Sequence, residues 1–76
     1  MEKILNIAKE IGIPDKDIKD IYEYLGHNEW GIALEILCST IEEHNIGITK
    51  KQYKEIEMIG KRMELNRALW NEICVL

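Results

Sequence analysis

Residues 26–43 read GHNEWGIALEILCSTIEE and predict one helix with apolar residues on more than one side. Between positions 30 and 41 the apolar residues are Trp30, Ile32, Ala33, Leu34, Ile36, Leu37, Cys38 and Ile41. A helix that buries a single stripe has about three or four apolar residues in two turns, so this set is too large for one stripe. We therefore expect a helix that other elements cover from several directions.

Helical angles divide this apolar set into two groups. At about 100° per residue, Ile32 and Ile36 point to a different side of the helix from the larger group. Within the larger group, the side chains that we expect to be most buried are Trp30, Leu34, Leu37 and Ile41. One narrow polar strip remains at spacings i, i+4 and i+7, and it consists of Glu35, Ser39 and Glu42.

Capping and breaker residues separate this helix from those before it. Apolar residues at helical spacing predict a first helix over residues 2–11, which Gly12 and Pro14 end. A second helix is predicted over 15–25, and the third runs to about residue 44 with Asn28 as its N-cap.

Two further helices are predicted after a loop at 45–48. Thr49 and Gln52 have the spacing of a capping box for a helix that begins near residue 50. Asn66 can cap a last short helix that carries Leu69, Trp70, Ile73 and Cys74. No alternating run or hairpin turn predicts a strand. The sequence thus predicts an all-α fold, a compact bundle of four to five short helices around a central apolar helix, in one domain over 1–76.

Charge and hydropathy exclude several classes of partner. Fourteen Asp and Glu against ten Lys and Arg give a net charge of -4, which repels a phosphate backbone. No run approaches the roughly 18 consecutive apolar residues of a membrane span, and the N-terminal MEKILNIAKE lacks the pattern of a signal peptide. We expect a cytoplasmic protein that binds neither nucleic acid nor membrane.

The residues that could support catalysis or bind a metal are few. His27 and His44 lie near opposite ends of one predicted helix, and Glu35 and Glu42 have no converging polar residues around them. Phosphate-binding glycine loops and Ser/His/Asp sets are absent. The two cysteines, at positions 38 and 74, have no CxxC spacing and lie in apolar patterns, so we expect buried reduced thiols. The chain is predicted not to be an enzyme and to need no cofactor.

Four large apolar side chains have either a core or a surface interpretation. Trp30 and Trp70 fit inward helical positions, so both are expected in the core. Met58 and Leu65 lie off the apolar stripe of the fourth helix. They either pack under the last helix or form an apolar patch that a partner covers.

The remaining functional candidates are acidic. They lie on the second helix as Asp17, Asp20 and Glu23, and on the third helix as Glu35, Glu42 and Glu43 with Ser39 between them. A solvated face explains any one of these carboxylates. As a group, with no Lys or Arg on the third helix, they would create a negative field that attracts a basic protein surface.

A family pattern begins at Gly26 and continues through the third helix. Its residues are Gly26, Glu29, Trp30, Ala33, Leu34 and Glu35, followed by Cys38, Glu42 and Glu43. A Gly-Ile-Thr loop at 47–49 and a helix bearing Tyr53 come next. Over about residues 22–70 this pattern resembles the small immunity proteins of the MafI type, which are encoded beside secreted bacterial toxins of the Maf and contact-dependent growth inhibition systems.

The resemblance implies a cytoplasmic immunity protein that binds and neutralises the C-terminal domain of a cognate toxin, often a ribonuclease or another nuclease. Nuclease sites are basic because they bind phosphate, so an acidic helical protein can occupy the same surface. The alternative is a small helical protein–protein interaction or oligomerisation module without a toxin partner.

Overall fold

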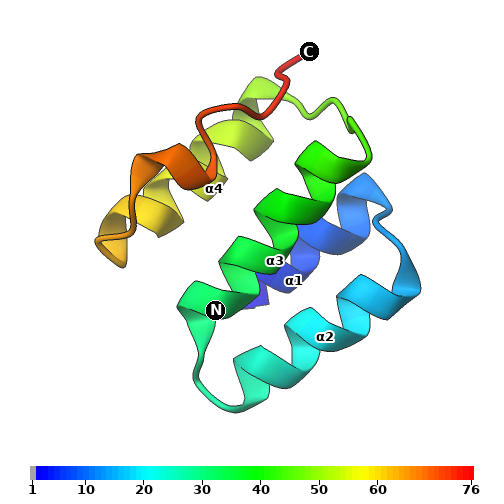
Figure 1. Ribbon diagram of the computed structural model, residues 1–76, viewed down its shortest axis with the longest axis vertical. Coiled ribbons are helices and arrows are strands. Elements are labelled where there is room, and N and C mark those ends of the chain that lie inside the picture. The colour runs from blue at the N-terminus through cyan, green and yellow to red at the C-terminus, as the bar shows by residue number, and fades with distance from the viewer. Residues whose placement is uncertain (1) are drawn as a thin grey trace.

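Four α-helices and one short 3₁₀ helix make up the computed structural model, which describes residues 2–76 (Figure 1). The elements are α1 (Glu2–Ile11), α2 (Asp15–Gly26), α3 (Trp30–Glu43), α4 (Lys50–Arg62) and the 3₁₀ helix η1 (Arg67–Leu69). Residues 2–76 contain no strand, only an isolated bridge between Ile48 and Val75. The predicted all-α fold and the predicted breaks between the helices are confirmed.

Helix α3 contacts every other helical element. In Figure 1 it lies between α1 and α2 on one side and α4 with η1 on the other. Its side chains Leu34, Leu37 and Ile41 are almost completely buried and meet Ile4 and Ile7 of α1 in the same core. Burying a side chain of this size stabilises the fold by about 1.5–3 kcal/mol. The burial of these three α3 residues agrees with the prediction from the helical period.

All four α-helices end in the same backbone motif. The residue after each helix cap has a positive φ, and these residues are Gly12 (74°), Asn28 (59°), Asn45 (49°) and Glu64 (56°). The next residue then donates its N–H to the carbonyl five residues earlier, as Ile13 does to Ala8 and Leu65 does to Gly60. This is the Schellman motif, which satisfies carbonyl groups that a helix end leaves unpaired.

The prediction that Asn28 is the N-cap of α3 is wrong. Glu29 holds that position and makes no side-chain capping bond, whereas Asn28 ends α2. Asparagine is favoured at both ends of helices, because its side chain can cap an N-terminus and because it tolerates a positive φ. Only residues 27–29 separate α2 from α3, so an asparagine in this turn could either end α2 or cap α3, and the sequence does not distinguish the two.

Two other predicted caps are confirmed. The backbone N–H of Gln52 donates to the Thr49 hydroxyl (3.1 Å), and the Thr49 N–H donates to the Gln52 side-chain oxygen (2.9 Å). These reciprocal bonds form the capping box of α4. The Asn66 side-chain oxygen accepts from the Ala68 N–H (2.9 Å) at the start of η1.

The segment after α4 contributes to the core without being mainly helical. The predicted last helix is only the three-residue η1, and Ile73 and Cys74 lie beyond it. The chain end is tied to the loop before α4, because the Ile48 N–H donates to the Cys74 carbonyl (3.1 Å) and the Leu76 N–H donates to the Ile48 carbonyl (2.8 Å). The turn after η1 breaks the helical period, so the longer helix was predicted wrongly.

Trp70 anchors this segment. It is 2% exposed, which confirms the prediction of a core position. Its ring lies directly against Gly60 of α4, where a Cβ atom would overlap the indole. The absence of a side chain at position 60 therefore makes room for the largest buried side chain of the protein.

Several predictions of burial are wrong. Trp30 is 39% exposed, because it is the first residue of α3 and no preceding turn of that helix completes its cover. Cys74 is exposed, since it lies outside the helix that was predicted to bury it. For Met58 and Leu65 the sequence leaves both alternatives open: Met58 is 60% exposed, whereas Leu65 is partly buried against the core and approaches Gly31.

Candidate functional site

The exposed side of α3 carries all the residues of that helix that were predicted to bind a partner. Glu35, Ser39, Glu42 and Glu43 are exposed, and they lie opposite the side of the helix that buries Leu34, Leu37 and Ile41. We call these four residues the acidic face of α3. Helix α3 buries its other side in the core, so this face is held on a rigid element.

Two of the three predicted acidic residues of α2 lie on its flank towards this face. Asp17 and Asp20 are partly buried and Glu23 is exposed. Tyr22, on the far flank of α2, lines a hollow against α1, so the flank with Asp17 and Asp20 is the one beside α3. Among residues 2–76 no hydrogen bond between side chains links α2 to α3.

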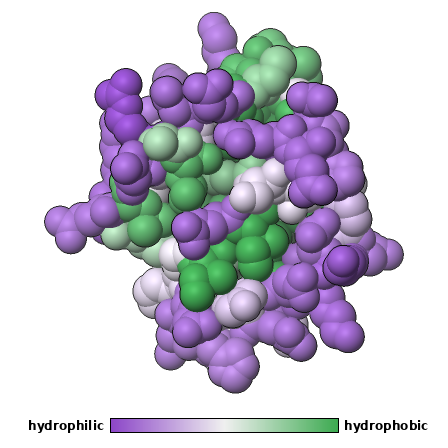
Figure 2. All heavy atoms as spheres, viewed as in Figure 1, coloured by the Kyte–Doolittle hydropathy of each residue, from purple (hydrophilic) through white to green (hydrophobic). Residues whose placement is uncertain are grey.

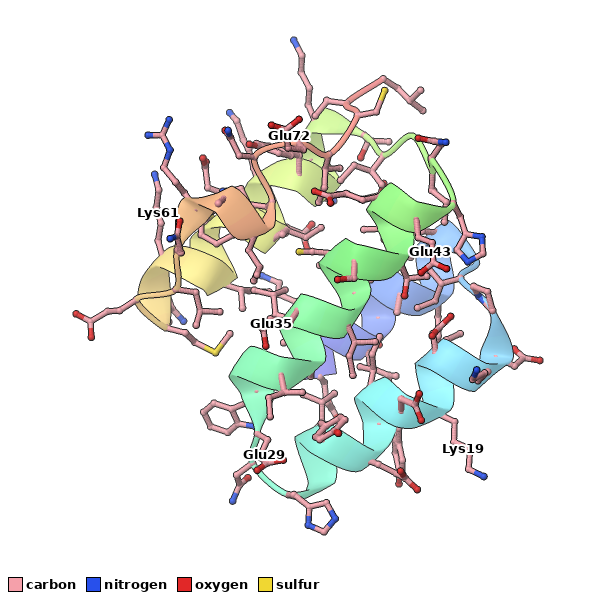
Figure 3. The ribbon with its side chains drawn as sticks, viewed as in Figure 1. Lys19, Glu29, Glu35, Glu43, Lys61 and Glu72 are labelled. Carbon is pink, nitrogen blue, oxygen red and sulfur yellow. The ribbon has the colours of Figure 1, made fainter. Side chains whose placement is uncertain are left out.

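Net negative charge is concentrated in the middle of the chain. Residues 20–49 contain no Lys or Arg and six carboxylates, which are Asp20, Glu23, Glu29, Glu35, Glu42 and Glu43. None of the six forms an ion pair with another described residue. Figure 3 shows Glu29, Glu35 and Glu43 along α3, with Lys19 and Lys61 towards opposite edges of the view. The carboxylates therefore act together on an approaching charge.

The thiol of Cys38 lies beneath the acidic face. Burial, together with the nearby carboxylates of Glu42 and Glu35, raises the pKa of Cys38 from its ordinary value of 9.0 to about 12. The thiol is 1% exposed and stays protonated at neutral pH, so it acts as a small core residue. The two carboxylates act on its pKa because Glu35 and Glu42, three residues before and four after Cys38, lie on the same side of α3 as this thiol.

An apolar side chain that was expected to be covered by other elements is exposed on the same helix as the carboxylates. Ile32 is 39% exposed. It precedes Ser39 by seven residues, which is two helical turns, so it lies on the same side of α3. Figure 2 shows apolar surface on this side of the molecule, framed by hydrophilic groups. The seven-residue spacing gives the direction of Ile32, whereas its exposure follows from the absence of a covering element among residues 2–76 on that side.

Two further exposed carboxylates, outside α3 itself, were not among the predicted site residues. Glu29 is exposed immediately before α3, and Glu72 is exposed on the segment after η1 (Figure 3). Glu29 could have been found from the charge pattern of residues 20–49. Glu72 could not, because its position depends on how the irregular segment after η1 packs.

Other surface features lie away from the acidic face. A hollow of about 280 Å³ opens between α1 and α2, and a smaller one of about 80 Å³ lies between α1 and α4. Within residues 2–76 no group of three His, Cys, Asp or Glu side chains is placed to hold a metal ion. The described helices are too short or too polar to cross a membrane.

Comparison with known proteins leaves the function open. No protein family, curated protein or solved structure matches the chain. A function has to be inferred from the chemistry of the surface itself.

Proposed function

We propose that this chain is an immunity protein that binds a basic toxin domain through the acidic face of α3, with the carboxylates of α2 beside it. One observation carries the proposal: α3 exposes Ile32 next to Glu35, and Glu42 follows two turns further along the same helix, in a stretch of sequence without Lys or Arg. The resemblance of residues 22–70 to immunity proteins of the MafI type supports this class of partner.

The chemistry of this surface matches that of a protein-binding site. Interfaces commonly combine an apolar centre, which is dehydrated on binding, with a polar rim that stays in water. Here Ile32 would supply apolar contact and the carboxylates would supply the rim. A nuclease presents cations where it holds the phosphates of its substrate, so the same cations would attract this face. The bound protein would then compete with nucleic acid for the nuclease surface.

Charge reversal on the acidic face tests the proposal. The variant Glu35→Lys/Glu42→Lys changes two exposed residues, so it should fold normally. The probe is the C-terminal domain of the protein encoded by the adjacent gene. Loss of a buried charge pair typically costs about 2–5 kcal/mol, so binding should weaken at least about thirtyfold. Cells that express the toxin domain should also lose protection.

A matched control separates the acidic face from net charge. Glu2→Lys/Glu64→Lys makes the same change in charge at two exposed positions outside this face and should bind the toxin domain like the parent. Ile32→Ser, which removes the exposed apolar side chain, should weaken binding without changing its dependence on salt. If the Glu35/Glu42 variant remains folded, binds as tightly as the parent across a salt series and protects cells, the proposal is wrong.

A further inference from the structure

The outer side of α4 is basic, although the protein as a whole is acidic. Lys51, Lys54, Lys61 and Arg62 are exposed there and surround Met58 at spacings of three, four and seven residues. We call these five residues the basic face of α4. Glu57 lies within 3.9 Å of Lys61, so that lysine is partly neutralised. The other three cations form no ion pair among residues 2–76.

Met58 is the second notable feature of this face. It is 60% exposed, the largest exposure of any apolar side chain within the helices except Tyr22. Beside it lies a hollow of about 80 Å³ between α4 and α1, lined by Lys3, Glu55, Met58, Ile59 and Arg62. The hollow combines the apolar surface of Met58 and Ile59 with two cations, of Lys3 and Arg62, and one carboxylate, of Glu55. It is large enough to receive part of one small aliphatic side chain.

The basic face is separate from the acidic face of α3. Helix α4 buries Ile56, Ile59 and Gly60 towards the core, where Gly60 contacts Trp70. The basic face is therefore on the side of α4 that turns away from α3. In Figure 3 Lys61 lies at the edge of the molecule farthest from α2. A partner on α4 would leave Glu35 and Glu42 accessible.

We infer that the basic face of α4 is a second binding surface, which takes an acidic protein segment bearing one aliphatic side chain. The carboxylates of the segment would face Lys51, Lys54 and Arg62, and its aliphatic side chain would pack on Met58 at the hollow. A nucleic acid fits less well, because α4 exposes no aromatic side chain for base stacking. A membrane fits less well, because one exposed methionine offers little apolar area to insert.

Binding of a defined peptide tests this inference. The probe is a fluorescent twelve-residue peptide of Asp, Glu and Ser with one central Leu, measured by anisotropy at low and moderate salt. The parent protein should bind it saturably, more weakly at higher salt. Replacing the Leu by Ser in the peptide, or Met58 by Ser in the protein, should weaken binding at least about fivefold, because each removes one side of the apolar contact.

Charge variants locate the surface. Lys51→Glu/Lys54→Glu should weaken peptide binding at least tenfold, and Lys51→Gln/Lys54→Gln should do so to a lesser extent. The matched control Lys16→Glu/Lys19→Glu, on exposed residues of α2, should stay within about threefold of the parent. Circular dichroism melts confirm that each variant is folded.

Four results would overturn the inference. One is the absence of saturable peptide binding, and another is equal weakening in the α2 control. The third is that the parent binds a single-stranded RNA or phosphatidylserine vesicles more tightly than it binds the peptide, and that Lys51→Glu/Lys54→Glu abolishes this binding. The fourth is concentration-dependent self-association of the parent that the α4 variant abolishes, since the acidic face of a second copy would then be the occupant.

Discussion

Helix α3 and the segment after α4 enter the same core by different means. In α3 the buried residues recur with the helical period, and the regular backbone decides which side chains turn inward. In residues 63–76 the backbone is mostly irregular, and Trp70 with Ile73 anchors it in the core. One region is positioned by many repeated contacts and the other by a few large side chains.

Each region has one tryptophan and one cysteine, with opposite outcomes. In α3 the cysteine is buried and Trp30 is 39% exposed, whereas after η1 the tryptophan is 2% exposed and the cysteine is accessible. Residue type therefore does not decide burial here. Position along the element does: Trp30 starts its helix, while Trp70 lies where Gly60 leaves space for its ring.

Replacing the two tryptophans should give the largest difference between the regions. Trp70→Ala should lower the free energy of unfolding by about 3–5 kcal/mol, because it removes the anchor and leaves a cavity. Trp30→Ala should cost only about 1 kcal/mol, because much of that side chain already contacts water. Urea titration of both variants measures the difference. Equal losses would contradict the view that Trp70 anchors its region and that Trp30 does not.

The contact between Gly60 and Trp70 should have a smaller but more specific effect. Gly60→Ala should destabilise the fold by about 1–3 kcal/mol, since the new methyl group overlaps the indole. Gly26→Ala is the control, because the space beside Gly26 is open and alanine favours a helix. In a Trp70→Ala background, Gly60→Ala should cost much less than in the parent. If Gly60→Ala lowers the free energy of unfolding as much in the Trp70→Ala background as in the parent, the indole is not the group that the new methyl overlaps.

The two thiols should differ in reactivity and in their effect on stability at high pH. A thiol reagent should modify Cys74 in the folded protein and Cys38 only on unfolding. Because the pKa of Cys38 is about 12 in the folded state and 9.0 is its ordinary value, the unfolded state loses this proton first as pH rises. Stability contributed by the protonated thiol is therefore present below pH 9.0 and is lost between these two values.

Other groups also titrate in this range, so the thiol is identified by comparison. Urea titrations of the parent and of Cys38→Ala at pH 8 and pH 10 should show a steeper loss of stability in the parent. Parallel losses in the two proteins would mean that Cys38 does not titrate on unfolding in this range.

The regular parts of the fold could be predicted from the sequence because they depend on local signals. Apolar spacing located the four helices, and the capping box at Thr49 located the start of α4. The segment after η1 could not be predicted in the same way. Its path depends on contacts between residues far apart in the chain, such as Trp70 with Gly60 and Ile48 with Val75.

The acidic face could be predicted in part. Charge and helical spacing placed Glu35, Ser39 and Glu42 on one exposed strip, as the structure has them. The exposure of Ile32 could not be predicted, because an apolar residue at a given angle is buried only if another element lies over it. Helical angles give the direction of a side chain, and the cover on that side depends on the tertiary fold.

The shared ending of the four helices bears on how the protein can evolve. Each Schellman motif is closed by hydrogen bonds between backbone atoms, and its positive-φ residue is exposed in every case. No turn side chain is needed to form those bonds, and a residue such as Glu64 at the positive-φ position costs only about 1–2 kcal/mol relative to glycine. Turn residues can thus diverge between descendants of this chain while the directions of the helices are inherited unchanged.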